Sequence, residues 1–430
     1  MTLHINSILP KRMGVMLALL IVGLYSPLGY SATDSAAVTT ALAKKVTISD
    51  ASSASQWQQT LEQAEGETVY WHAWGGDVRT NDFITWAGEQ TEALYDVKVK
   101  HVKLSSTSEA VTQVLAEKAA GRHTDGAVDM IWINGPNFLA MKQQQLLHGP
   151  FVNQLPNSKY LDLSSNSAAS VDFTEAVAGL EVPWRLARFV FIVDSKRVEH
   201  APLSMAQMLI WAQANPGRLT HPVISNFMGT TFLKQALIEL TPDPSVLQQA
   251  VTEQSFTPAT APLWHWYDAI KPHLWRAGKS FPENEAIQQQ MFSDGEIDIA
   301  MAFDPAAAAA GIASGLLPTS ARVFVPNQGS LGNISFVAIP YNASHTAGAK
   351  VLANFLLKPE TQAHMQNIDV LGSFSVLDPN KLDVLQAQVF AALPSSEALP
   401  TLDDLGPTLL EPHASWTTKL KLHWSQRYSQ

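Results

Sequence analysis

Residues 68–77 read TVYWHAWGGD, a run of β-branched and aromatic residues that ends at two glycines and an aspartate. Such a run, with no polar alternation, predicts a strand buried on both faces, and the glycines predict its end. Helical spacing follows over residues 81–94, and Val then alternates with Lys or His over residues 97–102, as in a second strand.

The alternation of strands and helices continues along the chain. An amphipathic helix is expected at 108–120, a strand at 128–133 and a helix at 138–147. The latter half repeats the pattern, with strands expected at 189–193, 222–224, 297–303, 323–325 and 334–339, and helices at 204–213, 229–240, 264–275, 284–292 and 344–357. Strands that alternate with helices predict mostly parallel or mixed sheets covered by helices, so the fold class is α/β.

The N-terminus has the pattern of an export signal. Lys11 and Arg12 precede an apolar run over residues 13–24, which is shorter than a membrane span, and the small residues Gly29, Ser31 and Ala32 follow. We therefore expect residues 1–32 to be a cleaved signal peptide, with an uncleaved anchor as the alternative, and residues 33–55 to be a flexible leader. The expected location is the periplasm.

Composition excludes several classes of function. The chain has 430 residues, a formal net charge of −10 and no cysteine. Nucleic acid is therefore not an expected partner, and thiolate catalysis and Cys-ligated metals are excluded. Neither a serine nucleophile elbow nor a phosphate-binding loop nor a zinc-binding histidine motif occurs, so no cofactor and no metal are expected. Two functional classes stay open at this point. One is a secreted hydrolase or lyase that uses carboxylates, and the other is a periplasmic scaffold or chaperone.

Four stretches carry a resemblance to a known family. They are residues 68–77, 128–137 (VDMIWINGPN), 291–301 (MFSDGEIDIAM) and 332–360, which runs from GNISFVAIP into AKVLANFLLKPE. In these stretches the chain resembles the extracellular solute-binding proteins of bacterial ABC importers, most closely the YnjB-type subgroup. The resemblance covers most of residues 66–372 and implies a binding protein, not an enzyme.

The resemblance also implies an architecture and a partner. It implies the two-lobed type 2 fold of periplasmic receptors, with a ligand cleft between the lobes and delivery of the solute to a membrane permease. Lobe 1 is expected to comprise residues 56–183 and 331–372, and lobe 2 residues 184–330. Residues 373–430 are expected to form a helical segment packed on lobe 2.

Ligand-binding residues are expected where strands end, because loops from neighbouring strands converge there in α/β sheets. The residues at these ends are Trp74, Gly75, Gly76, Asp77, Asn134, Gly135, Phe303 and Asp304. Each has a structural alternative: the glycines can form tight turns, Asn134–Gly135 a turn pair, and Asp304 a helix cap before Pro305.

Two further groups complete the predicted site. Trp184 and Arg185 lie at the expected first crossover between lobes, with hinge packing as the alternative. Asn226, Gly229, Thr230 and Thr231 lie where a helix is expected to open, and free N–H groups there can bind an anion. Ordinary N-capping by Thr230 is the alternative.

The residue types rank the possible ligands. Tryptophan faces with carboxylates suit an organic cation or a vitamin such as thiamine, through stacking and cation–π contact. A sugar ranks second, because it also stacks on Trp and its hydroxyls form hydrogen bonds with Asp and Asn side chains. An anion bound by Arg185 and residues 229–231 ranks third.

Overall fold

The computed structural model describes residues 54–164, 167–401 and 403–428. The predicted signal peptide and nearly all of the predicted leader lie outside these residues. A helix over residues 54–64 precedes the first strand and includes the last two residues assigned to the predicted leader. No helix in the described ranges combines the length and the apolar character that crossing a bilayer requires.

A mixed sheet that lies mostly in lobe 1 contains β1 (Thr68–Trp74), β2 (Lys98–Leu104), β3 (Met130–Ile133), β6 (Glu181–Arg188), β10 (Ser330–Ala338) and β11 (Thr408–Leu409). The strand order is β11-β10-β3-β1-β2, and β6 pairs with β10. β1 runs parallel to β2 and β3, whereas β10 runs antiparallel to β3 and β6. The continuous apolar sequence of β1 is explained by its central place, with Val69, Trp71 and Ala73 fully buried.

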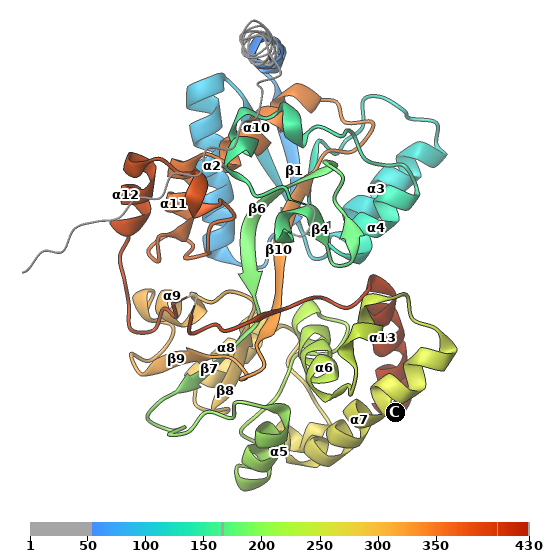
Figure 1. The fold of residues 1–430 in the computed structure, drawn as a ribbon, viewed down its shortest axis with the longest axis vertical. Coiled ribbons are helices and arrows are strands. Elements are labelled where there is room, and N and C mark those ends of the chain that lie inside the picture. The colour runs from blue at the N-terminus through green and yellow to red at the C-terminus, as the bar shows by residue number, and fades with distance from the viewer. Residues whose placement is uncertain (1–53, 165–166, 402, 429–430) are drawn as a thin grey trace, which may run out of the picture. The chain divides into compact units, whose positions relative to one another are not determined.

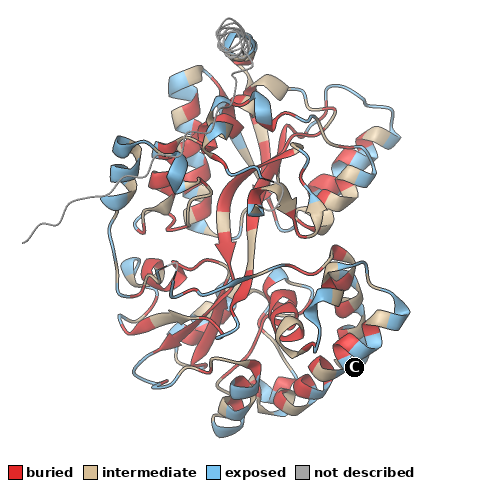
Figure 2. Ribbon diagram, viewed as in Figure 1, coloured by how far each residue is buried: buried red, intermediate tan, exposed pale blue. Residues whose placement is uncertain are grey.

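Helices cover this sheet (Figure 1). They are α2 (Val78–Tyr95), α3 (Ser108–Ala119), α4 (Pro136–Gln143), α10 (Thr346–Leu356), α11 (Pro359–Gln366) and α12 (Val384–Ala391). A hairpin of β4 (Val171–Asp172) and β5 (Glu175–Ala176) also belongs to this lobe. Short 3-10 helices lie at Val152–Gln154, Pro156–Tyr160, Ala168–Ser170 and Pro379–Lys381. The buried strands and the exposed outer faces of the helices are evident in Figure 2.

Lobe 2 has a smaller sheet, in which β7 (Val190–Asp194) pairs antiparallel with both β8 (Ile299–Ala302) and β9 (Ala321–Phe324). Its helices are α5 (Met205–Ala214), α6 (Phe227–Leu240), α7 (Glu253–Ile270), α8 (Glu285–Ser293), α9 (Ala307–Ala313) and α13 (Ala414–Tyr428). Short 3-10 helices lie at Pro244–Gln248, Lys271–His273 and Trp275–Gly278. The strand expected at 222–224 does not form, and the helix expected at 264–275 begins and ends earlier, as α7.

The strands β6 and β10 connect the lobes (Figure 1). Along β6, Trp184 belongs to the core of lobe 1, and Phe189 just beyond the strand belongs to the core of lobe 2. Along β10, Leu331 packs in lobe 2 and Phe336 in lobe 1. The boundaries expected at 183/184 and 330/331 therefore fall within the two crossover strands, which both lobes share.

The C-terminal segment divides between the lobes. At α12, the Gln386 side chain donates a hydrogen bond of 2.8 Å to the hydroxyl of Tyr160 in lobe 1. At α13, Trp416, Leu420 and Trp424 are buried in the core of lobe 2. The segment between these helices crosses the junction and is held there by the buried guanidinium of Arg188, which donates to the carbonyl oxygens of residues 405–407. Ala398 and Leu405 are also buried in a core cluster of lobe 2, so these two residues and α13 pack on lobe 2 as expected, whereas α12 contacts lobe 1.

Candidate functional site

The loop after β1 brings a carboxylate to the start of α2. Asp77 is the N-cap of this helix, and its side chain accepts hydrogen bonds from the Thr80 backbone N–H (3.1 Å) and hydroxyl (2.6 Å). The cap satisfies N–H groups that have no partner within the helix. Gly76 lies against the indole of Trp74, where a Cβ atom would come within 2.4 Å of the ring, and Gly75 packs closely on β2. The two glycines therefore serve the close turn, and Trp74 and Asp77 remain half-buried at its edge.

Arg185, on β6, joins this loop to lobe 2. Its guanidinium donates one hydrogen bond to the hydroxyl of Thr80 (3.4 Å) and another to the carboxylate of Asp304 (2.7 Å), which follows β8. Asp304 also accepts hydrogen bonds from the hydroxyl of Ser373 (2.9 Å) and the backbone N–H of Ala306 (3.0 Å). Because Thr80 belongs to lobe 1 and Asp304 to lobe 2, Arg185 bridges the lobes.

A third carboxylate, Glu285, adds to this group. Glu285 is the first residue of α8, after the N-cap Asn284, and it is half-buried. Burial raises the pKa of the Glu285 carboxyl to about 7, the nearby Asp77 and Asp304 carboxylates raise that pKa too, and Arg185 opposes them. Asp77, Glu285, Asp304 and Arg185 thus influence one another electrostatically, and we call these four residues the acidic end of the interlobe site.

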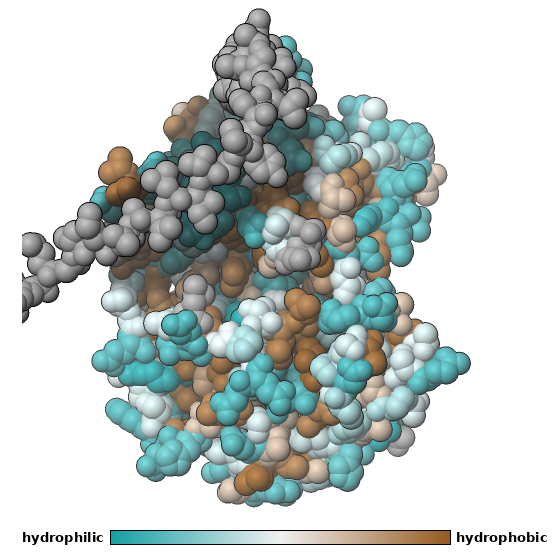
Figure 3. Space-filling model, in the orientation of Figure 1, coloured by the Kyte–Doolittle hydropathy of each residue, from teal (hydrophilic) through white to brown (hydrophobic). Residues whose placement is uncertain are grey.

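Aromatic rings flank the acidic end on both lobes. In lobe 1, Trp74 packs edge to face on Trp132, with ring centroids 6.4 Å apart, and the Arg185 guanidinium lies 5.9 Å from the Trp132 ring. In lobe 2, Phe303 packs edge to face on Phe227 at 5.1 Å. Figure 3 shows hydrophobic side chains at the level where the lobes meet. Trp74 and Asp304 therefore belong to one connected group of residues.

Trp184 has a different place from the one predicted. It is fully buried in the core of lobe 1, where its ring stacks on Phe83 at 6.0 Å and meets Trp71 edge to face at 5.6 Å. Successive side chains of a strand point to opposite faces, so Trp184 faces the core while Arg185 faces the interlobe site. The structure corrects the prediction of a ligand contact for Trp184 to a packing role.

Asn134 and Gly135 lie at the end of β3 but are covered there. The Gly135 backbone N–H donates a hydrogen bond of 2.6 Å to the Asp172 carboxylate. The ring of Phe173 lies on Gly135 so closely that a Cβ atom would come within 2.7 Å of it. The β4–β5 hairpin thus caps this strand end, and Gly135 is buried while Asn134 remains half-buried.

The predicted anion site is also corrected, because α6 begins earlier than expected. Asn226 is its N-cap, and the Asn226 side chain accepts a hydrogen bond of 2.8 Å from the Met228 N–H. Thr230 and Thr231 are buried within the helix, where their hydroxyls donate to the carbonyl oxygens of Ile224 (2.6 Å) and Phe227 (2.9 Å). Gly229 packs against the backbone of residues 222–223, so residues 229–231 offer no free groups to an anion.

Four residues of the site were not predicted from the sequence. They are Thr80, Trp132, Phe227 and Glu285. Trp132 could have been predicted, because it lies one residue before the end of a predicted strand. Phe227 becomes a candidate once the start of α6 is placed correctly. Glu285 gave no signal, because an acidic residue in the first turn of a helix is common for reasons of the helix dipole alone.

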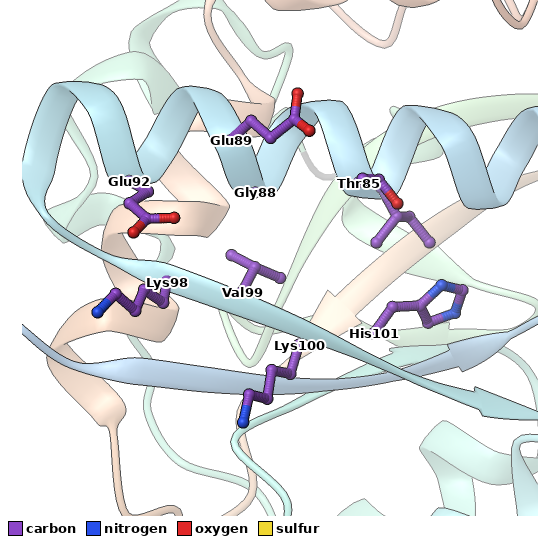
Figure 4. Close-up of a pocket in the computed structure, with 9 residues that line it drawn as sticks. Thr85, Gly88, Glu89, Glu92, Lys98, Val99, Lys100 and His101 are labelled. Carbon is purple, nitrogen blue, oxygen red and sulfur yellow. The ribbon is translucent and has the colours of Figure 1, made fainter.

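Two surface hollows lie elsewhere in lobe 1. One, of about 290 Å³, is a groove between α2 and the edge strand β2 (Figure 4). Glu89 and Glu92 of the helix and Lys98 and Lys100 of the strand line it, and Gly88 allows the helix to approach Val99. Alternating lysines are a common protection of an edge strand, which accounts for this groove. The other, of about 420 Å³, is lined by residues that include Tyr70, His72 and His345.

Among the described residues, no group of His, Asp and Glu side chains could hold a metal ion.

Comparison with known proteins defines the class. The model of the family of bacterial extracellular solute-binding proteins matches residues 85–378. The chain belongs to this family of solute-binding, non-enzymatic proteins. Among individual relatives, it is 40% identical to the protein YnjB of Escherichia coli (strain K12) over 379 residues, which cover 88% of this chain and 95% of that protein.

Solved structures share the fold at low sequence identity. The periplasmic binding protein AfuA of Actinobacillus pleuropneumoniae, with fructose-6-phosphate bound, matches with a TM-score of 0.58 at 14% identity over 84% of this chain and 99% of that one. The spermidine/putrescine substrate-binding protein PotD of Streptococcus pneumoniae matches with a TM-score of 0.55 at 14% identity over 85% of this chain and 100% of that one. The α/β fold of periplasmic binding proteins is thereby confirmed.

Proposed function

We propose that this protein is a periplasmic receptor that captures a small organic cation at the interlobe site and delivers it to an inner-membrane permease. The observation that carries the proposal is the gathering of the carboxyl groups of Asp77, Glu285 and Asp304 near Arg185, whose guanidinium is paired with Asp304. The periplasmic location is supported by the signal-like pattern of residues 1–32, and the intact mass of the exported protein would test it.

The electrostatics of Glu285 favour a cationic ligand. Burial first, and then the neighbouring carboxylates of Asp77 and Asp304, raise its pKa to about 7, so ionisation of Glu285 is unfavourable there. A ligand cation beside these groups would favour the ionised form of Glu285. Trp74 and Trp132 add flat aromatic faces, which attract organic cations by cation–π interaction.

An anion or a sugar phosphate is less well supported. The Arg185 guanidinium is already paired with Asp304 at 2.7 Å, and the hydroxyls of Thr230 and Thr231 are bonded within α6. The names of two structural neighbours mention spermidine or putrescine in one case and fructose-6-phosphate in the other. At 14% identity these neighbours do not decide between ligand classes, so the choice rests on the residues of this chain.

The carboxylates also argue against the alternative of a carboxylate-dependent hydrolase or lyase. Asp77 is engaged as a helix cap and Asp304 is engaged by Arg185 and Ser373. Both arrangements fix a negative charge in place, as suits cation binding. Membership of a family of non-enzymatic binding proteins points the same way.

The test is the affinity for cations when a carboxylate is neutralised. We expect wild-type protein to bind thiamine or a simple alkylamine, and Asp304→Asn to weaken that binding about tenfold or more, because hydrogen bonds and pairs with charged groups contribute ~1.5–3 kcal/mol. Isothermal titration calorimetry measures the change, and thermal unfolding shows that the variant is folded.

Glu283→Gln is the matched control, because Glu283 is an exposed acid in the segment that leads to Glu285. It removes the same charge and is expected to leave the affinity unchanged. If sugars or anions bind while every cation probe fails, or if Asp304→Asn binds cations as well as wild type does, the proposal is wrong.

A further inference from the structure

The ammonium group of Lys234, on α6, lies in an enclosure of two aromatic rings and a carboxylate. Its Nζ atom is 5.0 Å from the ring centroid of Phe173, 5.7 Å from that of Phe227 and 2.5 Å from a carboxylate oxygen of Glu411. The Lys234 side chain is only 2% exposed. Phe173 comes from the β4–β5 hairpin of lobe 1, Phe227 from α6 of lobe 2, and Glu411 from the C-terminal segment, so three separate parts of the chain converge here.

These groups are those that recognise an organic ammonium ion. Aromatic faces and a carboxylate attract a cation strongly when water is excluded. The enclosure is also held in place: Asn333 donates a hydrogen bond of 3.3 Å to the second Glu411 oxygen, and Phe173 adopts a left-handed backbone conformation with φ of 56°. That conformation is unfavourable for a bulky residue, so the fold positions the Phe173 ring at the expense of backbone strain.

The enclosure is continuous with the acidic end. The ring of Phe227 contacts the ring of Phe303 at 5.1 Å, and Phe303 directly precedes Asp304, the partner of Arg185. The interlobe site therefore has two positions suited to positive charge. The acidic end has an excess of carboxylates, whereas the enclosure, which we call the lysine end, is filled by the protein's own ammonium group.

We propose that Lys234 is a specificity-determining residue that fills the second cation position and restricts the receptor to ligands with a single cationic group. The proposal rests on the proposed function, since it concerns the same site. A ligand with two or more ammonium groups would bring one of them toward Lys234, where like charges repel and the nearby Glu411 carboxylate is already paired with Lys234.

The test compares matched amines of equal chain length. We expect wild-type protein to bind n-butylamine and n-pentylamine at least about tenfold more tightly than 1,4-diaminobutane and 1,5-diaminopentane. Lys234→Met leaves the Glu411 carboxylate without its partner, and a second ammonium group can then replace it. This variant should bind the diamines at least about tenfold more tightly than wild type does, with little change for the monoamines.

Two further variants keep the test decisive. Lys419→Met removes the cation of a surface ion pair with Glu253 in the same lobe, and it should not change the ratio of diamine to monoamine affinity. If Lys234→Met does not fold, Lys234→Met with Glu411→Leu replaces the buried pair by apolar groups, which proteins often tolerate. In the double variant the repelling ammonium group is absent, so the ratio of monoamine to diamine affinity should be smaller than in wild type. The gain in diamine affinity should be smaller than in Lys234→Met, because the Glu411 carboxylate is absent as well.

The outcomes separate this inference from the proposed function. One outcome is that monoamines bind in an Asp304-dependent way while the ratio of diamine to monoamine affinity is the same in wild type, Lys234→Met and the double variant. That result would overturn the role of Lys234 and leave the proposed function, a receptor for organic cations, in place. If neither amine series nor thiamine binds and Asp304→Asn changes nothing, the proposed function fails and this inference fails with it.

Discussion

The two ends of the interlobe site differ in how their charges are balanced. At the lysine end, the ammonium of Lys234 meets one carboxylate, that of Glu411, and both side chains are 2% exposed. At the acidic end, the guanidinium of Arg185 pairs with Asp304, and burial with the neighbouring Asp77 and Asp304 carboxylates raises the pKa of Glu285 to about 7. The charges at the first end are balanced within the protein, whereas under the proposed function the second end accepts a positive charge from the ligand.

The largest effect is expected from breaking the complete end. Glu411→Gln or Lys234→Met alone should lower the free energy of unfolding by ~3–5 kcal/mol, because the remaining buried charge loses its partner. Chemical denaturation followed by circular dichroism measures this change. Lys419→Met, at a partly exposed pair, should cost less than ~1 kcal/mol. If Glu411→Gln and Lys234→Met are each as stable as wild type, the ion pair of Lys234 and Glu411 does not balance its charges within the protein.

A smaller effect is expected at the aromatic wall of the acidic end. Trp74→Ala should weaken the binding of thiamine about five- to thirtyfold, because a desolvated cation–π contact contributes ~1–2 kcal/mol. Trp74 is half-buried, so the unfolding free energy should change little. Titration calorimetry and thermal unfolding give the two quantities. The opposite result, lost stability with unchanged affinity, would mean that Trp74 is a packing residue like Trp184.

The smallest effect is expected in the pH dependence set by Glu285. Because its folded pKa of about 7 exceeds the ordinary value of 4.5, the folded protein holds a proton that the unfolded chain releases between these values. Glu285 therefore makes the protein less stable as pH rises through this window, and the effect is constant above it. A bound cation favours the ionised carboxylate, so cation affinity should rise with pH up to about 7 and then level off.

Calorimetry in buffers of different ionisation enthalpy detects the proton released on binding. Glu285→Gln should abolish this release and flatten the pH profile of affinity between pH 5.5 and 8, a range that brackets the raised pKa of about 7. Glu283→Gln should leave the proton release on binding and the pH profile of affinity as in wild type. A wild-type profile that is flat, with no proton released, would contradict the placement of Glu285 at the ligand.

The fold was predictable from the sequence because its strands are strongly patterned. The run of β1 is buried and apolar, so its range was predicted as the structure has it, residues 68–74. Asp77, Arg185 and Asp304, which the structure brings close together, were selected from the sequence because they follow strand ends or a crossover, where α/β folds place their ligands. Their role in ligand binding stays a prediction.

The remaining residues depend on geometry that the sequence does not carry. Trp184 and Arg185 are neighbours on β6 with opposite roles, and only the register of the strand decides which side chain faces the lobe core. A start of α6 two residues earlier than predicted buries the hydroxyls of Thr230 and Thr231. The enclosure of Lys234 joins Phe173, Phe227 and Glu411, which are brought together only by the folded chain.

The most direct test of the central claim is native mass spectrometry of the protein isolated from the periplasm of its own cells, followed by release and identification of the bound small molecule. The account predicts a molecule with one cationic group, retained by wild type and lost from Asp304→Asn. A neutral sugar, an anion or a polyamine bound to the wild-type protein would contradict it.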